Sequence, residues 1–550
     1  MTLSAETRRD NIEWLKSNQL DLLVIGGGIT GAGVALNASV KGMASGLIEM
    51  QDFAAGTSSR STKLVHGGLR YLKNFEVALV ANVARERAII HRNAPHIVQP
   101  RKMLLPVYDE KNASFDDFSS EIALQLYDHL GEVSDEWHYS FISKEEVLQE
   151  AHGIKEKGLL KGGLYLDYLN DDARLTLSVL KTAHQKGAKI ANYVEAIGYI
   201  YNEKNKISGV EVVNKETGDR FTIAAEVVVN ATGPWSDETR NMQTSHQENR
   251  MLPTKGVHLV VEHSRLPVKR AIYTDTGLGD HRMLFIIPRN GKTYFGTTDT
   301  PYEGDLKDPK ITKEDVAYLL DAVNIRFPGA NLTIADIETG WSGLRPLIQP
   351  EDATNPSDIS REHEIFVSDE GLVTIGGGKL TDYRLMAEDT IKMIERLRGN
   401  VYPEVDTATI PLSGGQLKAS DTFADYCESA VKIGVRAGLS EKDAQELVAW
   451  YGTDFESVLN GMDAVKGSRL PMKDALSLQY AMDYEMTMNL EDYFLRRVEM
   501  LLFDYSRMRA LIIPALEQMT AYYQWDEKKQ QKEKEKLLSA MEAAHLSNLR

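Results

Sequence analysis

The feature that most constrains the fold is a hydrophobic strand that runs directly into a glycine-rich turn. Residues 21–25 are Asp-Leu-Leu-Val-Ile, and residues 26–33 are Gly-Gly-Gly-Ile-Thr-Gly-Ala-Gly. In a G-x-G-x-x-G sequence, the glycines permit a tight turn, a close approach to a pyrophosphate, and close packing of the next helix. The pattern predicts a Rossmann-type unit whose nucleotide-contacting residues are Gly26, Gly28, Ile29, Thr30 and Gly31.

An acidic residue follows the second expected strand of this unit. Residues 46–49 are Gly-Leu-Ile-Glu, and Glu49 lies about 20 residues beyond the glycines, where a ribose hydroxyl needs an acceptor. The following helix begins with unpaired amide groups and a positive dipole end, which bind phosphate. The strand, glycines, helix and acid together predict a bound dinucleotide.

Three further segments favour a flavin over a nicotinamide. Residues 226–235 form a second apolar strand that breaks at a glycine, residues 372–381 repeat the order of strand, glycines and helix start, and residues 56–63 supply hydroxyl donors. A helix N-terminus can stabilise the negative charge of a reduced flavin. We therefore expect FAD. The remaining residues expected to contact it are Thr57, Ser58, Ser59, Lys63, Leu64, His66, Gly67, Gly68, Val194, Ala231, Thr232, Gly233, Gly377, Gly378, Lys379, Leu380 and Thr381.

Five long blocks resemble FAD-dependent glycerol-3-phosphate dehydrogenases, in the same order along the chain. They are residues 56–72, 255–258, 296–299, 343–347 and 377–381. The similarity is greatest to the Gram-positive branch, which includes aerobic, quinone-linked dehydrogenases and the related glycerol-3-phosphate oxidases. It implies an FAD-binding domain of the glutathione-reductase-like or D-amino-acid-oxidase-like class, and oxidation of sn-glycerol 3-phosphate to dihydroxyacetone phosphate with a noncovalent flavin.

The expected architecture is α/β, with an oxidoreductase body over residues 1–400 and an all-α domain over residues 401–550. An antiparallel sheet should cover the substrate. The FAD-binding segments are expected at about 20–95, 160–250 and 340–398, and the substrate-binding segments at about 96–158 and 251–339. In the C-terminal part, residues 440–443 match a capping box, and residues 489–492 should start an α-helix with an apolar stripe that contains Phe494 and Leu501.

The substrate that the resemblance implies needs cations for its phosphate and a base for its hydroxyl proton. Arg345 and Arg70 offer planar forks for phosphate oxygens, and Lys379 can bind the substrate or stabilise reduced flavin. His258 is the candidate base, because a neutral imidazole can accept a proton near pH 7. A histidine at a strand start is also commonly structural. Hydrogen bonds to the substrate hydroxyls are expected from Tyr71 and Thr298.

Composition excludes several other classes. The chain has 63 Lys and Arg against 80 Asp and Glu, a net charge of −17 that disfavours nucleic-acid binding. Its one cysteine, Cys427, leaves no internal disulfide and fits a reduced cytoplasmic setting. The histidines show no metal-ligand spacing, so no metal is expected. No apolar stretch reaches the roughly 18 residues of a membrane span.

The electron acceptor remains open between a quinone and dioxygen. No second G-x-G-x-x-G follows a strand, so a nicotinamide partner is not indicated. The resemblance favours a membrane quinone, with the enzyme peripheral to the cytoplasmic face of the membrane, and is compatible with a homodimer. The oxidases of this branch carry an extra segment between the last two blocks, whereas here only residues 348–375 separate them. An oxygen-reducing oxidase is the alternative, and a catalytically silent FAD-binding protein is disfavoured by the retained site residues.

Overall fold

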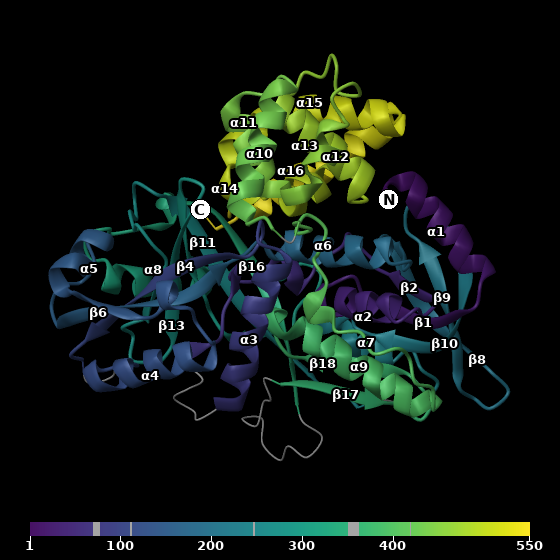
Figure 1. Cartoon of the computed structure of the whole chain (residues 1–550), viewed down its shortest axis with the longest axis horizontal. Coiled ribbons are helices and arrows are strands. Elements are labelled where there is room, and N and C mark those ends of the chain that lie inside the picture. Colours follow the sequence, from purple (N-terminus) through teal and green to yellow (C-terminus); the bar gives the residue numbers. More distant parts are fainter. Residues whose placement is uncertain (70–76, 111–112, 246–247, 350–361, 419, 550) are drawn as a thin grey trace.

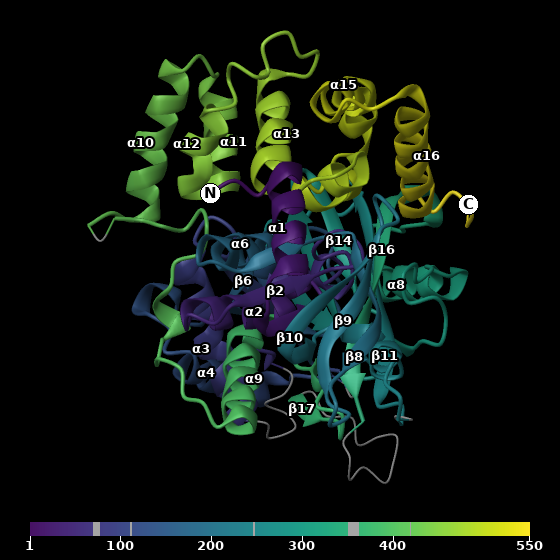
Figure 2. The same ribbon diagram turned by 90° about the vertical axis from the view of Figure 1, so that its right-hand side faces the viewer.

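The computed structural model describes residues 1–550 except 70–76, 111–112, 246–247, 350–361, 419 and 550. Two β-sheets lie side by side in the body, and a helical C-terminal domain is stacked on one side of them (Figure 1). The view turned by 90° shows this domain as a separate layer above the body (Figure 2). The N-terminal helix α1 (Ala5–Ser17) packs on the outer part of the first sheet.

The first sheet contains the predicted nucleotide-binding unit. Its described strands follow the order β17-β18-β10-β1-β2-β7, with β8 and β9 continuing antiparallel to β10. The central strand β1 is parallel to both β10 and β2, and its apolar residues are buried on both faces. The strands are β1 (Leu20–Ile25), β2 (Ser45–Ile48), β7 (Lys189–Ala191), β8 (Val194–Tyr201), β9 (Ile207–Asn214), β10 (Arg220–Asn230), β17 (His363–Val367) and β18 (Val373–Gly377).

Helices cover the first sheet, and they follow from the sequence between its strands. Helix α2 (Ile29–Val40) begins at the glycine turn and packs against α6 (Asp172–Gln185) and α9 (Tyr383–Arg398). The short helix α7 (Ser236–Arg240) follows the glycine at the end of β10.

The second sheet is largely antiparallel, and helices pack on both of its faces. Its described strands follow the order β15-β11-β14-β13-β12-β4-β6-β3, and β16 and β5 pair with β11 and β6. The covering helices are α3 (Val77–Asn93), α4 (Asp117–Leu130), α5 (Lys144–Glu150) and α8 (Lys313–Arg326). The strands are β3 (Leu64–Val65), β4 (Gln99–Tyr108), β5 (Ser140–Ser143), β6 (Leu159–Leu169), β11 (Met251–Glu262), β12 (Ile272–Asp275), β13 (Met283–Arg289), β14 (Lys292–Gly296), β15 (Thr300–Pro301) and β16 (Ile337–Ile348).

Three strands of this sheet come from segments that the sequence assigned to FAD binding. Strand β6 pairs with β4 over its whole length, β16 pairs with β11, and β3 pairs with the end of β6. The backbone pairing therefore places more of the chain in the substrate-side sheet than its sequence position indicated. The chain therefore alternates between the two sheets within the expected segments, and which segments bind FAD or substrate stays a prediction.

The C-terminal domain is helical, as predicted, and shares a hydrophobic core with the body. Ser440 caps α11 by accepting a hydrogen bond from the backbone N–H of Asp443. Trp341 on β16 contacts Phe503 of this domain with ring centroids 5.8 Å apart. Among the described helices, none is long and apolar enough to cross a membrane. The α-helices are α10 (Phe423–Arg436), α11 (Glu441–Tyr451), α12 (Phe455–Leu459), α13 (Met472–Tyr484), α14 (Met500–Phe503), α15 (Tyr505–Tyr523) and α16 (Glu527–Ala544).

The predicted α-helix after residue 489 differs in the structure. Residues Asp492–Arg497 form a π-helix, and Glu499 then adopts a positive φ of 50° before α14 begins. The wider turn accompanies the pairing of both Arg496 and Arg497 with the buried carboxylate of Asp52 in the body. This long-range ion pairing overrides the local α-helical pattern.

Candidate cofactor and active site

A cavity lies between the two sheets, at the carboxyl ends of the parallel strands. Residues that follow β1, β2, β10 and β18 line one side of it, and residues of β11 and β16 line the other. Ligands of open parallel sheets bind at this edge. The predicted cofactor residues that line the cavity are Gly26, Gly28, Ile29, Thr30, Glu49, Thr57, Ser58, Leu64, His66, Val194, Ala231, Thr232, Gly233, Gly377, Gly378, Lys379, Leu380 and Thr381.

The glycine turn has the geometry of a pyrophosphate cradle. Gly26 has a φ of 114°, and a Cβ atom there would lie 2.5 Å from the carbonyl oxygen of Ala231. Gly28 is the N-cap of α2, where the helix amides face the cavity, and a Cβ atom there would lie 3.2 Å from Ser58 Oγ. A Cβ atom on Gly31 would lie 2.0 Å from the carbonyl oxygen of Gly26, so only glycine permits this helix–strand contact. The cradle therefore fits a dinucleotide.

Glu49 is the acceptor expected for a ribose hydroxyl. Its carboxylate accepts hydrogen bonds from the backbone N–H groups of Gly27, at 2.7 Å, and Gln51, at 2.8 Å. Burial raises the pKa of Glu49 to about 7, although these two hydrogen bonds oppose the shift. The carboxyl is thus fixed at the cavity wall by the glycine turn itself.

Several predicted residues do not line the cavity. Gly31, Ser59, Lys63, Gly67 and Gly68 lie behind its wall, and Gly67 donates its backbone N–H to Tyr127 at 2.7 Å. Their direct contact with FAD stays a prediction. Arg70 and Tyr71 lie outside the described residues.

Thr298 is hydrogen-bonded to the backbone of β11. It is 2 % exposed, accepts a hydrogen bond from the N–H of Val257, and donates its hydroxyl to the carbonyl oxygen of Lys255. Both hydrogen bonds hold Thr298 against β11 beside the cavity. The hydroxyl is therefore engaged by the backbone and does not line the cavity, and its contact with substrate stays a prediction.

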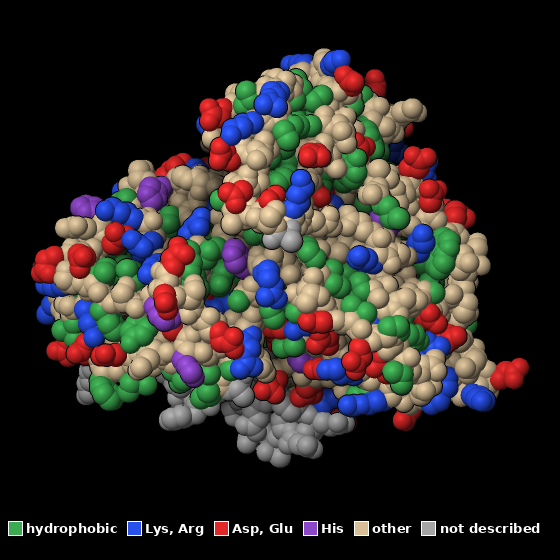
Figure 3. All heavy atoms as spheres, in the orientation of Figure 1, with side chains coloured by type: hydrophobic (Ala, Val, Ile, Leu, Met, Phe, Trp, Pro, Cys, Tyr) green, Lys and Arg blue, Asp and Glu red, His purple; other side chains and the backbone are tan. Residues whose placement is uncertain are grey.

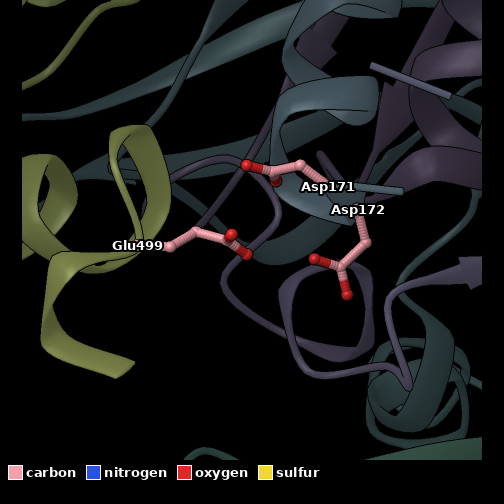
Figure 4. A group of neighbouring side chains, drawn as sticks. All are labelled: Asp171, Asp172 and Glu499. Carbon is pink, nitrogen blue, oxygen red and sulfur yellow. The ribbon is translucent and has the colours of Figure 1, made fainter. Parts of the chain in front are cut away.

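Lys63 neutralises a cluster of buried carboxylates. Asp171 and Asp172 at the start of α6 approach Glu499 of the C-terminal domain closely enough to hold a cation (Figure 4). The Nζ atom of Lys63 lies 2.7 Å from both Asp172 Oδ1 and Glu499 Oε1, and Arg289 also pairs with Glu499. Lys63 and Arg289 thus neutralise the negative charge of these carboxylates. The expectation that the protein binds no metal stays a prediction.

His258 lies on β11 at the cavity wall and is 2 % exposed. Its ring stacks on Trp341 at a centroid distance of 4.8 Å, and its Nε2 atom lies 3.0 Å from Thr62 Oγ1. The buried Nδ1 atom has no hydrogen-bond partner among the described residues. Burial, and then the charges of Arg345 and Lys63, lower the pKa of His258 well below its ordinary value. The imidazole is therefore neutral at pH 7.

Arg345 extends from β16 into the same cavity and is held by acceptors on one side. Its Nη1 atom donates to Asp299 Oδ1, and its Nη2 atom donates to Thr297 Oγ1 and to the carbonyl oxygen of Thr298, all at 3.1 Å. A Cβ atom on Gly256 would lie 2.7 Å from Arg345 Nη2. The glycine before His258 in the sequence block therefore makes room for the guanidinium.

Lys379 lies where β18 ends, after two glycines with positive φ. Gly377 and Gly378 have φ values of 73° and 69°, and the backbone N–H of Lys379 donates to Asp382 at 2.7 Å. The charge of Lys379 helps to lower the pKa of His66 to about 3, although burial is the larger cause. His66 is therefore a neutral ring on the cavity wall. Lys379 and Arg345 place positive charge at the site.

Two further cations and an aromatic ring line the cavity without having been predicted as contacts. These residues are Arg60, Lys307 and Trp235. Burial is the main cause that lowers the pKa of Arg60. Thr62, the partner of His258, was also missed. Arg60 and Thr62 lie inside the sequence block of residues 56–72, and this position could have identified them as site residues. No local sequence pattern marks Lys307.

The cradle predicts a specific loss of cofactor. Gly28→Val should abolish FAD retention, because the larger side chain enters the space beside Ser58 where a phosphate would approach the helix N-terminus. The measurement is flavin absorbance per mole of purified protein, before and after reconstitution with FAD. Gly329→Val is the matched control, because nothing lies within 4 Å of its Cβ position and its φ is not in the left-handed region. Equal flavin content in the Gly28→Val variant would contradict the cradle.

Comparison with known proteins agrees with this geometry. Residues 21–384 match the family model described as FAD dependent oxidoreductase, and residues 405–530 match the C-terminal domain of alpha-glycerophosphate oxidase. An alpha-glycerophosphate oxidase of Streptococcus pyogenes serotype M6 is 43 % identical over 608 residues, which cover 100 % of this chain and 99 % of that protein.

Two dehydrogenases are similarly related. The aerobic glycerol-3-phosphate dehydrogenase of Bacillus subtilis is 44 % identical over 525 residues, which cover 94 % of each chain. The crystal structure of the glycerol-3-phosphate dehydrogenase of Bacillus halodurans, complexed with FAD, is 38 % identical, covers 98 % of both chains and has a TM-score of 0.84. The chain therefore belongs to the FAD-dependent oxidoreductases, in the group formed by alpha-glycerophosphate oxidases and aerobic glycerol-3-phosphate dehydrogenases, and FAD is its cofactor.

Proposed function

We propose that the protein oxidises sn-glycerol 3-phosphate to dihydroxyacetone phosphate and passes the electrons to a membrane quinone in glycerol catabolism. The observation that supports this most directly is a neutral histidine, His258, beside the cations Arg345 and Lys379 on the wall of a dinucleotide cavity. The related dehydrogenases named above carry this substrate in their names.

The reaction requires a proton to leave the C2 hydroxyl and a hydride to leave C2. FAD, when bound, supplies the hydride acceptor. His258 accepts the hydroxyl proton, since its imidazole is uncharged before substrate binds. The substrate phosphate, held by Arg345 and Lys379, would fix the orientation of C2.

The guanidinium of Arg345 is already oriented for this role before substrate arrives. Its contacts with Asp299 and Thr297 hold the planar group, so little side-chain entropy remains to be lost on binding. The buried ring stack of His258 on Trp341 fixes the base in the same way. The site is thus preorganised on two paired strands, β11 and β16.

Arg345→Ala should lower kcat/KM for sn-glycerol 3-phosphate by an amount that corresponds to about 2 to 4 kcal/mol, because it removes a charge-assisted bond to the phosphate. Steady-state kinetics with a soluble quinone analogue measure this. Glycerol itself serves as the control substrate, since it lacks the phosphate and its weak turnover should change little. An unchanged kcat/KM for the phosphorylated substrate would remove Arg345 from the binding site.

The lengths of the aligned chains favour a dehydrogenase. The alignment with the streptococcal oxidase spans 608 positions against the 550 residues here, so at least 58 oxidase positions have no counterpart. The alignment with the Bacillus subtilis dehydrogenase spans only 525 positions while covering 94 % of both chains. A quinone acceptor also implies that the enzyme works while bound peripherally to the cytoplasmic face of the membrane, and a homodimer is compatible with this arrangement.

The oxidase is the second candidate, because the streptococcal relatives that match the whole chain bear that name. The deciding experiment reduces the flavin anaerobically with sn-glycerol 3-phosphate and then adds either a menaquinone analogue in lipid vesicles or air-saturated buffer. We expect reoxidation by the quinone to be much faster, with little hydrogen peroxide. Rapid peroxide formation without quinone activity would favour the oxidase and make membrane docking unnecessary.

A further inference from the structure

A second cavity, of about 640 Å³, lies at the junction of the body and the C-terminal domain. Its walls come from the start of β4, the loop between β6 and α6, and the end of α11. Residues 269–271, just before β12, and residues 288–290, at the end of β13, complete the lining. It shares no lining residue with the flavin cavity. We refer to it as the junction cavity.

The junction cavity is strongly basic although the protein is acidic. Six arginine and lysine side chains line it, and among the described lining residues the carboxylate of Asp171 is the one acidic group. The whole chain, in contrast, has a net charge of −17, and acidic and basic side chains are interspersed over the face shown in Figure 3. A concave site lined by one sign of charge concentrates ions of the opposite sign.

Among the described residues, three of these cations have no carboxylate within ion-pair distance, and only the longer-range charges of Asp128 and Glu150 act on Lys102 and Lys269. In the part of the chain that the structure describes, no hydrogen bond or ion pair engages the ammonium groups of Lys102 and Lys269, and Arg101 donates only to neutral oxygens of Pro100 and Gln99. The remaining three, in contrast, are paired with carboxylates outside the lining. These pairs are Arg174 with Glu485, Arg270 with Glu150 and Arg289 with Glu499. The lining of the cavity therefore carries more positive than negative charge.

Buried polar atoms on the inner wall also lack partners. Asn170 is 1 % exposed, and neither its Nδ2 nor its Oδ1 atom has a hydrogen-bond partner among the described residues. The same holds for Arg174 Nε and Asp171 Oδ2, whose residues are 4 % and 6 % exposed. Leaving a buried polar group unsatisfied costs about 1 to 3 kcal/mol, so several such groups on one wall indicate a polar occupant.

We propose that the junction cavity binds the phosphate group of an anionic organic molecule, either a phosphorylated metabolite or the headgroup of an anionic phospholipid. Lys102, Lys269 and Arg101 supply charges for the phosphate oxygens. The amide and carboxylate oxygens of Asn170 and Asp171 accept hydrogen bonds from hydroxyls of the organic part. A metal cation is disfavoured by the surrounding positive charge.

An occupant at this place would strengthen the contact between the two parts of the protein. Arg289, on the cavity wall, donates to the carbonyl oxygen of Asn170 and pairs with Glu499 of the C-terminal domain. Neutralising the surplus charge beside this pair lowers the repulsion among the six lining cations, all of which belong to the body. Binding should therefore raise the midpoint of thermal unfolding, which gives a readout independent of catalysis.

The test uses FAD-loaded protein that also carries Arg345→Ala, so that phosphate binding at the flavin site is weakened. Calorimetric titration with inorganic phosphate compares this protein with the same protein carrying Lys102→Ser and Lys269→Ser. We expect the double substitution to weaken phosphate binding about 10- to 100-fold and to abolish the phosphate-dependent rise in thermal midpoint. Lys204→Ser with Lys528→Ser is the control, since it removes the same charge at exposed positions outside the cavity.

A parallel experiment identifies the source of the phosphate. The same variants are mixed with phosphatidylglycerol vesicles and with phosphatidylcholine vesicles, and bound protein is measured by flotation. Loss of binding to phosphatidylglycerol vesicles in the Lys102/Lys269 variant alone assigns the cavity to a lipid headgroup, whereas loss of phosphate binding alone assigns it to a soluble metabolite. If the cavity variant and the control bind both probes equally well, the proposal is wrong.

Discussion

Replacement of His258 by glutamine should slow reduction of the bound flavin by sn-glycerol 3-phosphate about 10²- to 10⁴-fold, because the group that takes the hydroxyl proton is lost. Glutamine approximates the volume of the ring and can still hydrogen-bond to Thr62, whose hydroxyl lies 3.0 Å from His258 Nε2. The buried stack on Trp341 is then disturbed as little as possible. Anaerobic stopped-flow measurement of flavin bleaching reports this step alone.

The control for this prediction is the second half-reaction. Reoxidation of chemically reduced flavin by a quinone should proceed at the wild-type rate in the His258→Gln variant, since no substrate proton is transferred in that step. Flavin content should also be unchanged. A further variant, Thr62→Val, removes only the partner of Nε2 and should cause a smaller loss. If the His258→Gln enzyme reduced its flavin at the wild-type rate, another residue would have to be the base.

The sequence could predict the parts of the site that depend on local backbone geometry. Gly26, Gly28 and Gly31 are required by contacts within one strand–turn–helix unit, and Glu49 lies at the end of the neighbouring strand. The spacing of such residues is fixed by the unit itself. His258 and Arg345 were found through sequence blocks, and the structure then places both on the cavity wall because β11 pairs with β16.

The sequence could not predict features set by distant partners. Lys63 lies in a block expected to contact FAD, but its ammonium is engaged by Asp172 and Glu499. Strand β6 belongs to the second sheet because it pairs with β4, although its apolar pattern fits either sheet. The π-helix of Asp492–Arg497 likewise accompanies ion pairs that cross more than 400 positions of sequence. Patterns of 2 or 3.6 residues carry no information about such pairs.

The second prediction with a large expected effect concerns these distant ion pairs. Asp52→Asn should lower the free energy of unfolding by about 3 to 5 kcal/mol, since it leaves the buried guanidinium groups of Arg496 and Arg497 without their shared counter-charge. Asp52 Oδ2 lies 2.6 Å from Arg496 Nε and 2.7 Å from Arg497 Nη1, and Asp52 and Arg497 are both 0 % exposed in their side chains. Denaturant unfolding followed by circular dichroism measures the difference.

The pH dependence separates this ion-pair effect from a packing defect. The two arginines lower the pKa of Asp52 to about 2, so its carboxylate contributes stability above the unfolded pKa of about 3.9 and loses that contribution only as pH falls through about 2. The stability difference between wild type and Asp52→Asn should therefore stay constant from pH 7 to about 4 and shrink at lower pH. Asp463→Asn, which breaks an exposed pair with Lys466, should leave the stability nearly unchanged at any pH. A comparable loss in both variants would mean that the Asp52 pairs do not hold the C-terminal domain to the loop that follows β2.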